Sequence, residues 1–202
     1  SFAYQPIDVP QDYFFFQVAI KGLTGGHSGD DINKNRANAN KLLNRFLTQL
    51  QDKYDFYLCS IDGGNLHNAI PREACALCAV PMKDKENVRI DMNIYTAEIE
   101  NEFSVTEPNL RTELGSESPV AQAIDREVVK NLLKSVYAVH NGVYAWSQDM
   151  PGLVETSSNL ASIKMREDEQ GAYIEINTSQ RSSKEPSKHH LKWVVEQALA
   201  LA

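Results

Sequence analysis

The stretch GLTGGHSGDDINKNRANANKLL, residues 22–43, decides the fold prediction for this chain. It places His27 in a glycine-rich loop between a strand-forming run (13–20) and a helix-forming run (35–50). Because glycine tolerates positive φ, such a loop can approach another group closely and turn the imidazole outward. Taken alone, the loop favours a flexible strand-to-helix turn that carries His27 incidentally.

Apolar spacing on either side of this loop predicts an α+β fold of two tandem, ferredoxin-like-related α/β sandwich halves. Each half would be a sheet with helices on one face. The first half is expected at residues 1–104 and the second at 105–202. Strands are expected at 13–23, 56–61, 74–80, 109–114, 143–146, 152–164 and 172–178, and helices at 35–50, 86–103, 118–136 and from 186 to Ala202.

Composition excludes several classes of protein. The 202 residues contain 42% hydrophobic and 23% charged residues, which is ordinary for a globular protein. A net charge of −7 offers no basic field for nucleic acid or an anionic membrane, and no apolar run approaches the roughly 20 residues of a membrane span. No signal peptide is recognised. The chain starts at Ser1 without an initiator Met, so we expect a domain of a longer protein.

The three cysteines indicate a reducing compartment, because an odd count in a chain of this length is not a disulfide framework. Cys75 and Cys78 have the spacing of a metal or redox pair. They fall in a run expected to form a strand, where residues three apart face opposite sides. No second pair or nearby histidine completes a zinc set, so Cys59, Cys75 and Cys78 are expected to be core residues.

Three further polar segments could contribute chemistry. Asn68 lies in a glycine- and asparagine-rich turn, where it either serves the turn alone or presents its amide to a ligand. Residues 155–159 place polar side chains, among them Thr156 and Asn159, in an apolar strand, where they could simply satisfy a sheet edge. Arg181, at the end of the last expected strand, is either a solvated surface residue or binds a carboxylate through its guanidinium group.

In order along the chain, four segments resemble the lid domain of the dipeptidase D family. This family is the aminoacyl-histidine (Xaa-His) dipeptidase branch of the two-zinc aminoacylase and carboxypeptidase-type metallopeptidases. The segments are GLTGGHSGDDINKNRANANKLL (22–43), SIDGGNLHNAIPREA (60–74), GLVETSSNLASI (152–163) and INTSQRSS (176–183). The resemblance extends from about Tyr13 to the end of the chain. It implies that the chain is the inserted lid of a two-zinc peptidase.

The resemblance also implies roles for individual residues. His27 would donate a hydrogen bond to the oxyanion of the tetrahedral intermediate, a contribution of about 3–4 kcal/mol in a site that excludes water. Asn68 would hydrogen-bond the substrate, and Arg181 would bind the free carboxylate of the dipeptide. Thr156 and Asn159 are further candidates at the same rim. No zinc ligand can be carried over, so the two zinc ions are expected in a catalytic domain outside this chain, and the chain alone should be inactive.

One departure from the family pattern concerns the arginine. In simpler dimeric relatives it ends the strand that follows the asparagine, but here that strand ends in Val80-Pro81-Met82. The matching Arg181 occurs in the second half. We therefore expect the two halves to act as a pseudo-dimer that closes one site, with the first half supplying His27 and Asn68. His27 and Arg181 on opposite faces would contradict this hypothesis.

The expected partners are the catalytic domain of the same polypeptide, a dipeptide substrate and a second copy in a homodimer, with no nucleic acid and no membrane. The expected location is the cytoplasm. Two alternatives remain at this point: a stand-alone oligomerisation module and a peptide-binding module without catalysis.

Overall fold

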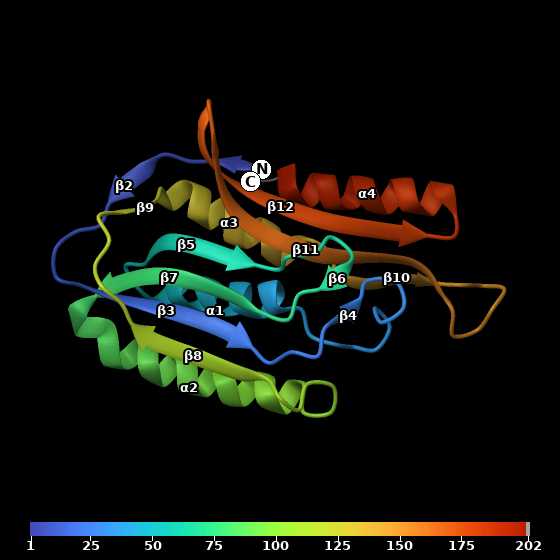
Figure 1. Ribbon diagram of the computed structural model, residues 1–202, viewed down its shortest axis with the longest axis horizontal. Helices are drawn as coiled ribbons and strands as arrows, with labels where there is room; N and C mark the ends of the chain where they lie inside the picture. The colour runs from blue at the N-terminus through green and yellow to red at the C-terminus, as the bar shows by residue number, and fades with distance from the viewer. Residues whose placement is uncertain (201–202) are drawn as a thin grey trace.

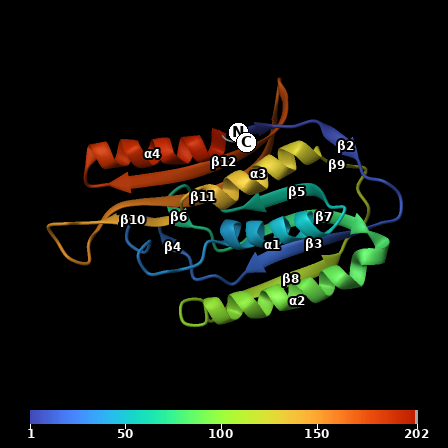
Figure 2. The same cartoon turned by 180° about the vertical axis from the view of Figure 1, so that it is seen from behind.

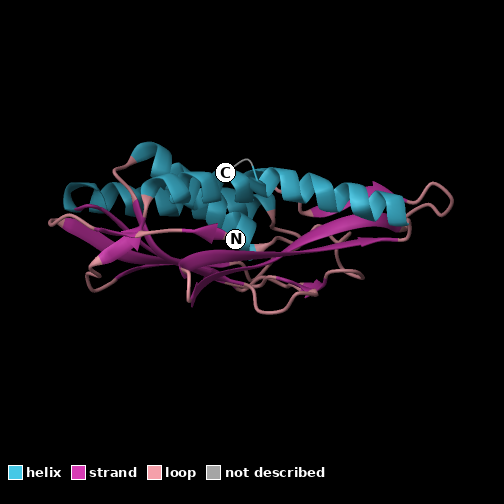
Figure 3. Cartoon of the chain, turned by 90° about the horizontal axis from the view of Figure 1, so that it is seen from above, coloured by secondary structure: helices cyan, strands magenta, loops and turns pink. Residues whose placement is uncertain are grey.

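The main sheet is antiparallel throughout and carries four α-helices on one face, as the computed structural model describes for residues 1–200 (Figures 1 and 3). Its strand order is β1-β12-β11-β5-β7-β3-β8, with β10 also paired to β11. The strands of this sheet are β1 (Phe2–Ala3), β3 (Tyr13–Lys21), β5 (Tyr57–Gly63), β7 (Ala74–Pro81), β8 (Arg111–Ser116), β10 (Gly142–Trp146), β11 (Val154–Asp168) and β12 (Gly171–Ser182). The helices are α1 (Ala39–Lys53), α2 (Lys85–Glu102), α3 (Arg126–Ala138) and α4 (Glu185–Ala200). Two short ribbons lie outside it: β2 (Pro6–Asp8) with β9 (Gln122–Ile124), and β4 (Gly26–His27) with β6 (Ala69–Ile70).

The first half has the ferredoxin-like element order β3-α1-β5-β7-α2-β8, with the spatial order β5-β7-β3-β8. Alternate residues of β3, including Phe16 and Val18, are fully buried on the helix side of the sheet. The apolar stripe of α1, with Phe46 and Leu50 fully buried, packs against them. The predicted α+β class, with helices on one face of a sheet, is confirmed.

The second half joins the first edge to edge. β11 pairs antiparallel with β5 at Ile163 and Gly63, and α3 lies beside α1 (Figure 2). An antiparallel strand pair with a helix pair above it is the arrangement expected at a two-fold interface. This arrangement is compatible with the pseudo-dimer hypothesis, which stays a prediction. The division at residues 104 and 105 stays a prediction, and the sheet continues across it because β8 pairs with β3.

A buried asparagine fixes α1 to the second half. Asn38, 3% exposed, caps α1 by accepting from the backbone N–H groups of Asn40 and Lys41. Its Nδ2 donates to the carbonyl of Leu160 at 2.9 Å and to Oδ1 of Asn141 at 3.0 Å. The helix that follows the His27 loop therefore has a fixed position on β11.

Two helix starts differ from the sequence prediction. α1 begins at Ala39, four residues after the predicted start at residue 35. α3 begins at Arg126 and not at Ser118-Pro119, because residues 122–124 form β9 and pair with β2. Asp125 then caps the helix by accepting from the N–H of Val128 at 3.0 Å. The expected continuation of α4 to Ala202 lies outside the described residues.

The prediction that Cys75 and Cys78 face opposite sides of a strand is confirmed, but the prediction that all three cysteines are core residues is wrong in part. Cys78 belongs to the core beneath the helices, while Cys75 lies on the other face of β7 and is partly exposed, as is Cys59. The reason is that the face of the sheet without helices is less covered.

The three thiols should react slowly with a thiol reagent in the native chain. Burial raises the pKa of Cys59 to about 11 and raises that of Cys75 and Cys78 above the ordinary value. The thiolate is the reactive form, so we expect Cys59 to be labelled about 100-fold more slowly at pH 7.5 than in the urea-unfolded chain, and Cys75 and Cys78 also to be labelled more slowly. Mass spectrometry of the labelled chain checks this. Rapid labelling of any native cysteine would contradict it.

Candidate functional site

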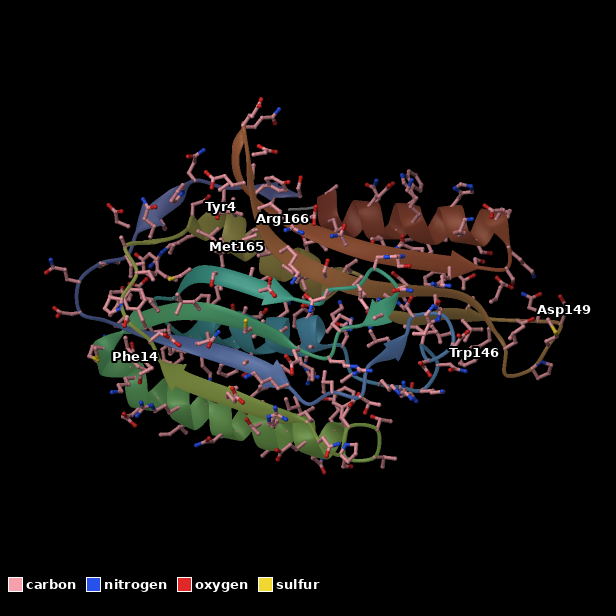
Figure 4. The ribbon with its side chains drawn as sticks, in the orientation of Figure 1. Tyr4, Phe14, Trp146, Asp149, Met165 and Arg166 are labelled. Carbon is pink, nitrogen blue, oxygen red and sulfur yellow. The ribbon has the colours of Figure 1, made fainter. Side chains whose placement is uncertain are left out.

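The β4–β6 ribbon brings the His27 loop and the Asn68 turn together. His27 pairs with Ala69, and the backbone N–H of Ser28 donates to the carbonyl of Asn68 at 2.8 Å. The ribbon lies toward the end of the sheet from which the β10–β11 hairpin extends, labelled by Trp146 and Asp149 in Figure 4. His27 and Asn68, predicted from separate segments, therefore occupy one site.

Two glycines of the His27 loop are required for two reasons: their backbone has positive φ, and neighbouring side chains leave no space for a Cβ atom. Gly25 and Gly26 have φ of 64° and 139°, where other residues are strained. A Cβ at Gly25 would lie 2.5 Å from the Arg72 side chain, and one at Gly26 would overlap the Arg36 guanidinium. The loop is thus packed against two arginine side chains.

Arg181 reaches the same loop from the second half. It lies near the end of β12, paired with Ser157 of β11. A Cβ placed on Gly29 would be 3.1 Å from Nη1 of Arg181 and 3.2 Å from Cε1 of His27. His27 and Arg181 thus lie beside the same glycine, and the opposite-face arrangement that would contradict the pseudo-dimer is not what the structure has. Within residues 1–200, no ion pair joins Arg181 to a carboxylate.

A surface pocket of about 680 Å³ opens beside His27. Its lining includes Asn68, Leu66, Arg72 and Glu73, all from the turn between β5 and β7 or its exit. This volume lies within the range of small-molecule sites. Asn68 is half-buried here, so its side chain is placed where a ligand could reach it.

Thr156 and Asn159 lie behind this surface. Thr156 is fully buried, with its hydroxyl 2.8 Å from that of Ser182. Asn159 is 1% exposed, and its Nδ2 donates to the carbonyl of Ala69 at 2.8 Å. Direct substrate contact by these two side chains stays a prediction. The contact that the structure records for Asn159 supports the turn that carries Asn68.

Two carboxylates that sequence reasoning did not single out hold the His27 loop. Glu107 is 3% exposed and accepts from the backbone N–H of Thr24 at 2.6 Å and of Ala37 at 2.9 Å, at the two ends of the loop segment. Asp31 accepts from the N–H of His27 at 2.8 Å. Its pKa is lowered by the hydrogen bond from Lys34 and then by the one from His27. The sequence signal for Asp31 is its place four residues after His27, whereas nothing local connects Glu107 to the loop.

Within residues 1–200, no group of three or more His, Cys, Asp or Glu side chains could hold a metal ion. None of the helices in the described part of the chain is long and apolar enough to cross a membrane.

Known proteins with similar sequence and fold indicate the family that this chain resembles. Residues 18–107 match the family model described as a peptidase dimerisation domain. Over 183 residues the chain is 34% identical to the cytosol non-specific dipeptidase of Escherichia coli (strain K12), covering 91% of this chain and 37% of that protein. The aminoacylhistidine dipeptidase of Vibrio alginolyticus has the same fold over 99% of this chain, with a TM-score of 0.93 and 30% identity. The match covers 40% of that protein.

The fold and the matched model define the class of the chain, which is a peptidase dimerisation domain. The resemblance to the lid and dimerisation domain of the dipeptidase D family, predicted from the sequence, is confirmed by these matches. It spans about two fifths of the length of the relatives it matches.

Proposed function

We propose that this chain is the substrate-binding lid of a zinc-dependent dipeptidase that hydrolyses Xaa-His-type dipeptides. The observation that carries the proposal is the meeting of His27 and Arg181, one from each half, beside Gly29. A hydrogen-bond donor and a free guanidinium at this spacing suit the two charged parts of a dipeptide in hydrolysis, the developing oxyanion and the terminal carboxylate.

Each residue of the site has a separate task in this proposal. His27 donates to the oxyanion, Asn68 hydrogen-bonds the substrate, and Arg181 binds its free carboxylate. Thr156 and Asn159 are further substrate-binding candidates behind this surface, and Asn159 also holds the turn that carries Asn68. Two zinc ions, bound outside this chain, supply the activated water.

The remaining parts of the proposal follow from the relatives. The first lid subdomain (1–104) carries His27 and Asn68, and the second (105–202) carries Arg181. The partners are the catalytic domain of the same polypeptide and a second copy of the protein, in the cytoplasm. Catalysis needs the zinc-binding part, so the lid alone should not hydrolyse dipeptides.

Arg181→Ala in the full-length protein should raise KM for a dipeptide about 10- to 100-fold, with a smaller loss of kcat. The reason is that a charge-assisted bond to the carboxylate is worth about 1.5–3 kcal/mol and is present in both ground and transition state. Steady-state kinetics with a Xaa-His dipeptide and with its C-terminal amide measures this. The amide should bind equally poorly to wild type and variant.

Arg166→Ala is the matched control. Arg166 is an exposed arginine of β11 that lies 3.6 Å from Glu175. Arg181 pairs with the start of β11, whereas Arg166 lies toward the end of that strand (Figure 4). Its removal should leave KM unchanged. If Arg181→Ala lowers kcat alone, the carboxylate-binding role is wrong.

The alternative function is oligomerisation without a part in catalysis, which the dimerisation-domain match favours. The two proposals differ in their outcome for the site. A lid that only joins subunits would tolerate Arg181→Ala and His27→Ala with unchanged kinetics. Light scattering of the full-length protein would then show a dimer for both variants, and steady-state kinetics would show that both are fully active.

A further inference from the structure

The His27 ring has a fixed hydrogen-bond pattern at Nδ1. The backbone N–H of Gly29 donates to this atom at 3.3 Å, and that of Asp30 at 3.4 Å. A backbone N–H can only donate, so Nδ1 must be the unprotonated nitrogen of the neutral ring. The proton then resides on Nε2, because neutral imidazole carries one N–H.

We infer that Asp31 is a positioning residue that holds His27 as the Nε2–H tautomer. Asp31 closes the turn from both sides: its Oδ2 accepts from the N–H of His27 at 2.8 Å, and its own N–H donates to the carbonyl of His27 at 3.0 Å. This closed turn is what directs the amides of Gly29 and Asp30 at the imidazole. Asp31 touches no substrate in this arrangement and acts through the backbone.

The Asp31 carboxylate is itself held in place. Lys34 donates to Oδ1 at 2.6 Å, and Nη1 of Arg36 lies 3.4 Å from Oδ2. Arg36 also donates to the carbonyl of Gly25 at 2.5 Å, so the same guanidinium binds the start of the loop and the carboxylate that closes it. The crowding at Gly26 by Asp31 and Arg36 explains why no side chain fits there.

A competing contact exists on the same nitrogen. Oδ2 of Asp30 lies 3.3 Å from Nδ1 of His27, and it could accept a proton placed there. The Asp30 side chain is 88% exposed, and exposed pairs contribute little. Protonation of Nδ1 would also remove the acceptor for two backbone N–H groups. The geometry therefore favours the Nε2–H form.

This inference deepens the proposed function and rests on it for its catalytic meaning. An Nε2–H group is a donor at the tip of the ring, while Nδ1 is occupied by the loop. Such a ring can donate to an oxyanion without any rearrangement, which is the property that preorganised donors require.

Nuclear magnetic resonance of the full-length protein, labelled with ¹⁵N-histidine, tests the tautomer directly. At a pH where the ring is neutral, His27 should show a pyridine-like Nδ1 and a pyrrole-like Nε2, assigned by the signals missing in His27→Gln. Asp31→Ala should shift His27 toward the mixture of tautomers found in free histidine. Asp31→Asn, which keeps an oxygen acceptor for the His27 N–H, should retain most of the Nε2–H form and guards against a folding defect.

Asp30→Asn is the matched control and should leave the tautomer unchanged. The inference is overturned if wild-type Nδ1 carries the proton, if Asp31→Ala leaves a folded protein with an unchanged tautomer, or if Asp30→Asn has the larger effect.

Kinetics separates this inference from the proposed function. Asp31→Ala should lower kcat for a Xaa-His dipeptide about 10-fold with little change in KM, and Asp30→Asn should not. If the tautomer behaves as expected while His27→Ala and Asp31→Ala both keep the wild-type kcat, the oxyanion role of His27 is wrong and the positioning role of Asp31 stands.

Discussion

His27→Ala in the full-length protein should lower kcat for a Xaa-His dipeptide by about 10²–10³-fold, with a much smaller change in KM. The expectation follows from the position of the ring beside the pocket, with Nδ1 bonded to the loop and Nε2 left to donate. A donor that acts on the oxyanion stabilises charge that exists only in the transition state, so its loss affects kcat first. Steady-state kinetics at saturating zinc measures both constants.

His189→Ala is the matched control for this variant. His189 is an exposed histidine of α4 with only a long contact to Glu185, and it should have no effect on either constant. His27→Gln, which keeps an N–H donor on a more flexible side chain, should recover part of the lost rate. A variant in which KM rises while kcat stays at the wild-type value would show that His27 binds the ground state and the transition state equally.

Glu107→Ala should lower the free energy of unfolding of the chain by about 2–4 kcal/mol. The Glu107 carboxylate is buried and accepts from the backbone N–H groups of Thr24 and Ala37. Truncation leaves both donors without a partner, and it also removes the link between the two ends of the His27 loop. Urea unfolding followed by circular dichroism measures the change, provided that the m value stays constant.

Glu113→Ala is the comparison for this loss. Glu113 is half-exposed on β8 and pairs with Lys21 at 2.7 Å, so its removal should cost less than about 1 kcal/mol. Hydrogen exchange should also become faster at the amides of Thr24 and Ala37 in Glu107→Ala. Equal destabilisation by the two variants would mean that the buried carboxylate has no special part in holding the loop.

Local patterns predicted the elements that have a clear apolar signal. β3 is a short, strand-forming apolar run in which only Gln17 is exposed, and α1 buries a stripe that includes Phe46 and Leu50, so both could be recognised without a structure. The start of α3 could not be recognised from the sequence. Ser118-Pro119 is a good local start signal, but residues 122–124 pair with β2 from the other end of the chain, and that pairing prevails.

The candidate site divides in the same way. The glycine loop, the Asn68 turn and Arg181 were singled out as candidates from their segments, because glycine and polar residues at strand ends leave a local signal, and the family resemblance then implied their roles. Asp31 and Glu107 were missed as supports. Each carboxylate accepts hydrogen bonds from backbone N–H groups of the loop. Which acidic residue meets these groups depends on the path of the folded chain, and the neighbouring residues in the sequence do not indicate it.

By itself, the sequence determined the α+β class of this protein, its resemblance to the lid of the dipeptidase D family, and the place of His27 in the segment between β3 and α1. Only the tertiary structure decided that β5 pairs with β11, that Arg181 lies beside Gly29 with His27, and that Glu107 closes the loop. The physical reason is that periodicity records which face of an element is buried, whereas the contacts between two halves depend on edges and side chains that are distant in the chain.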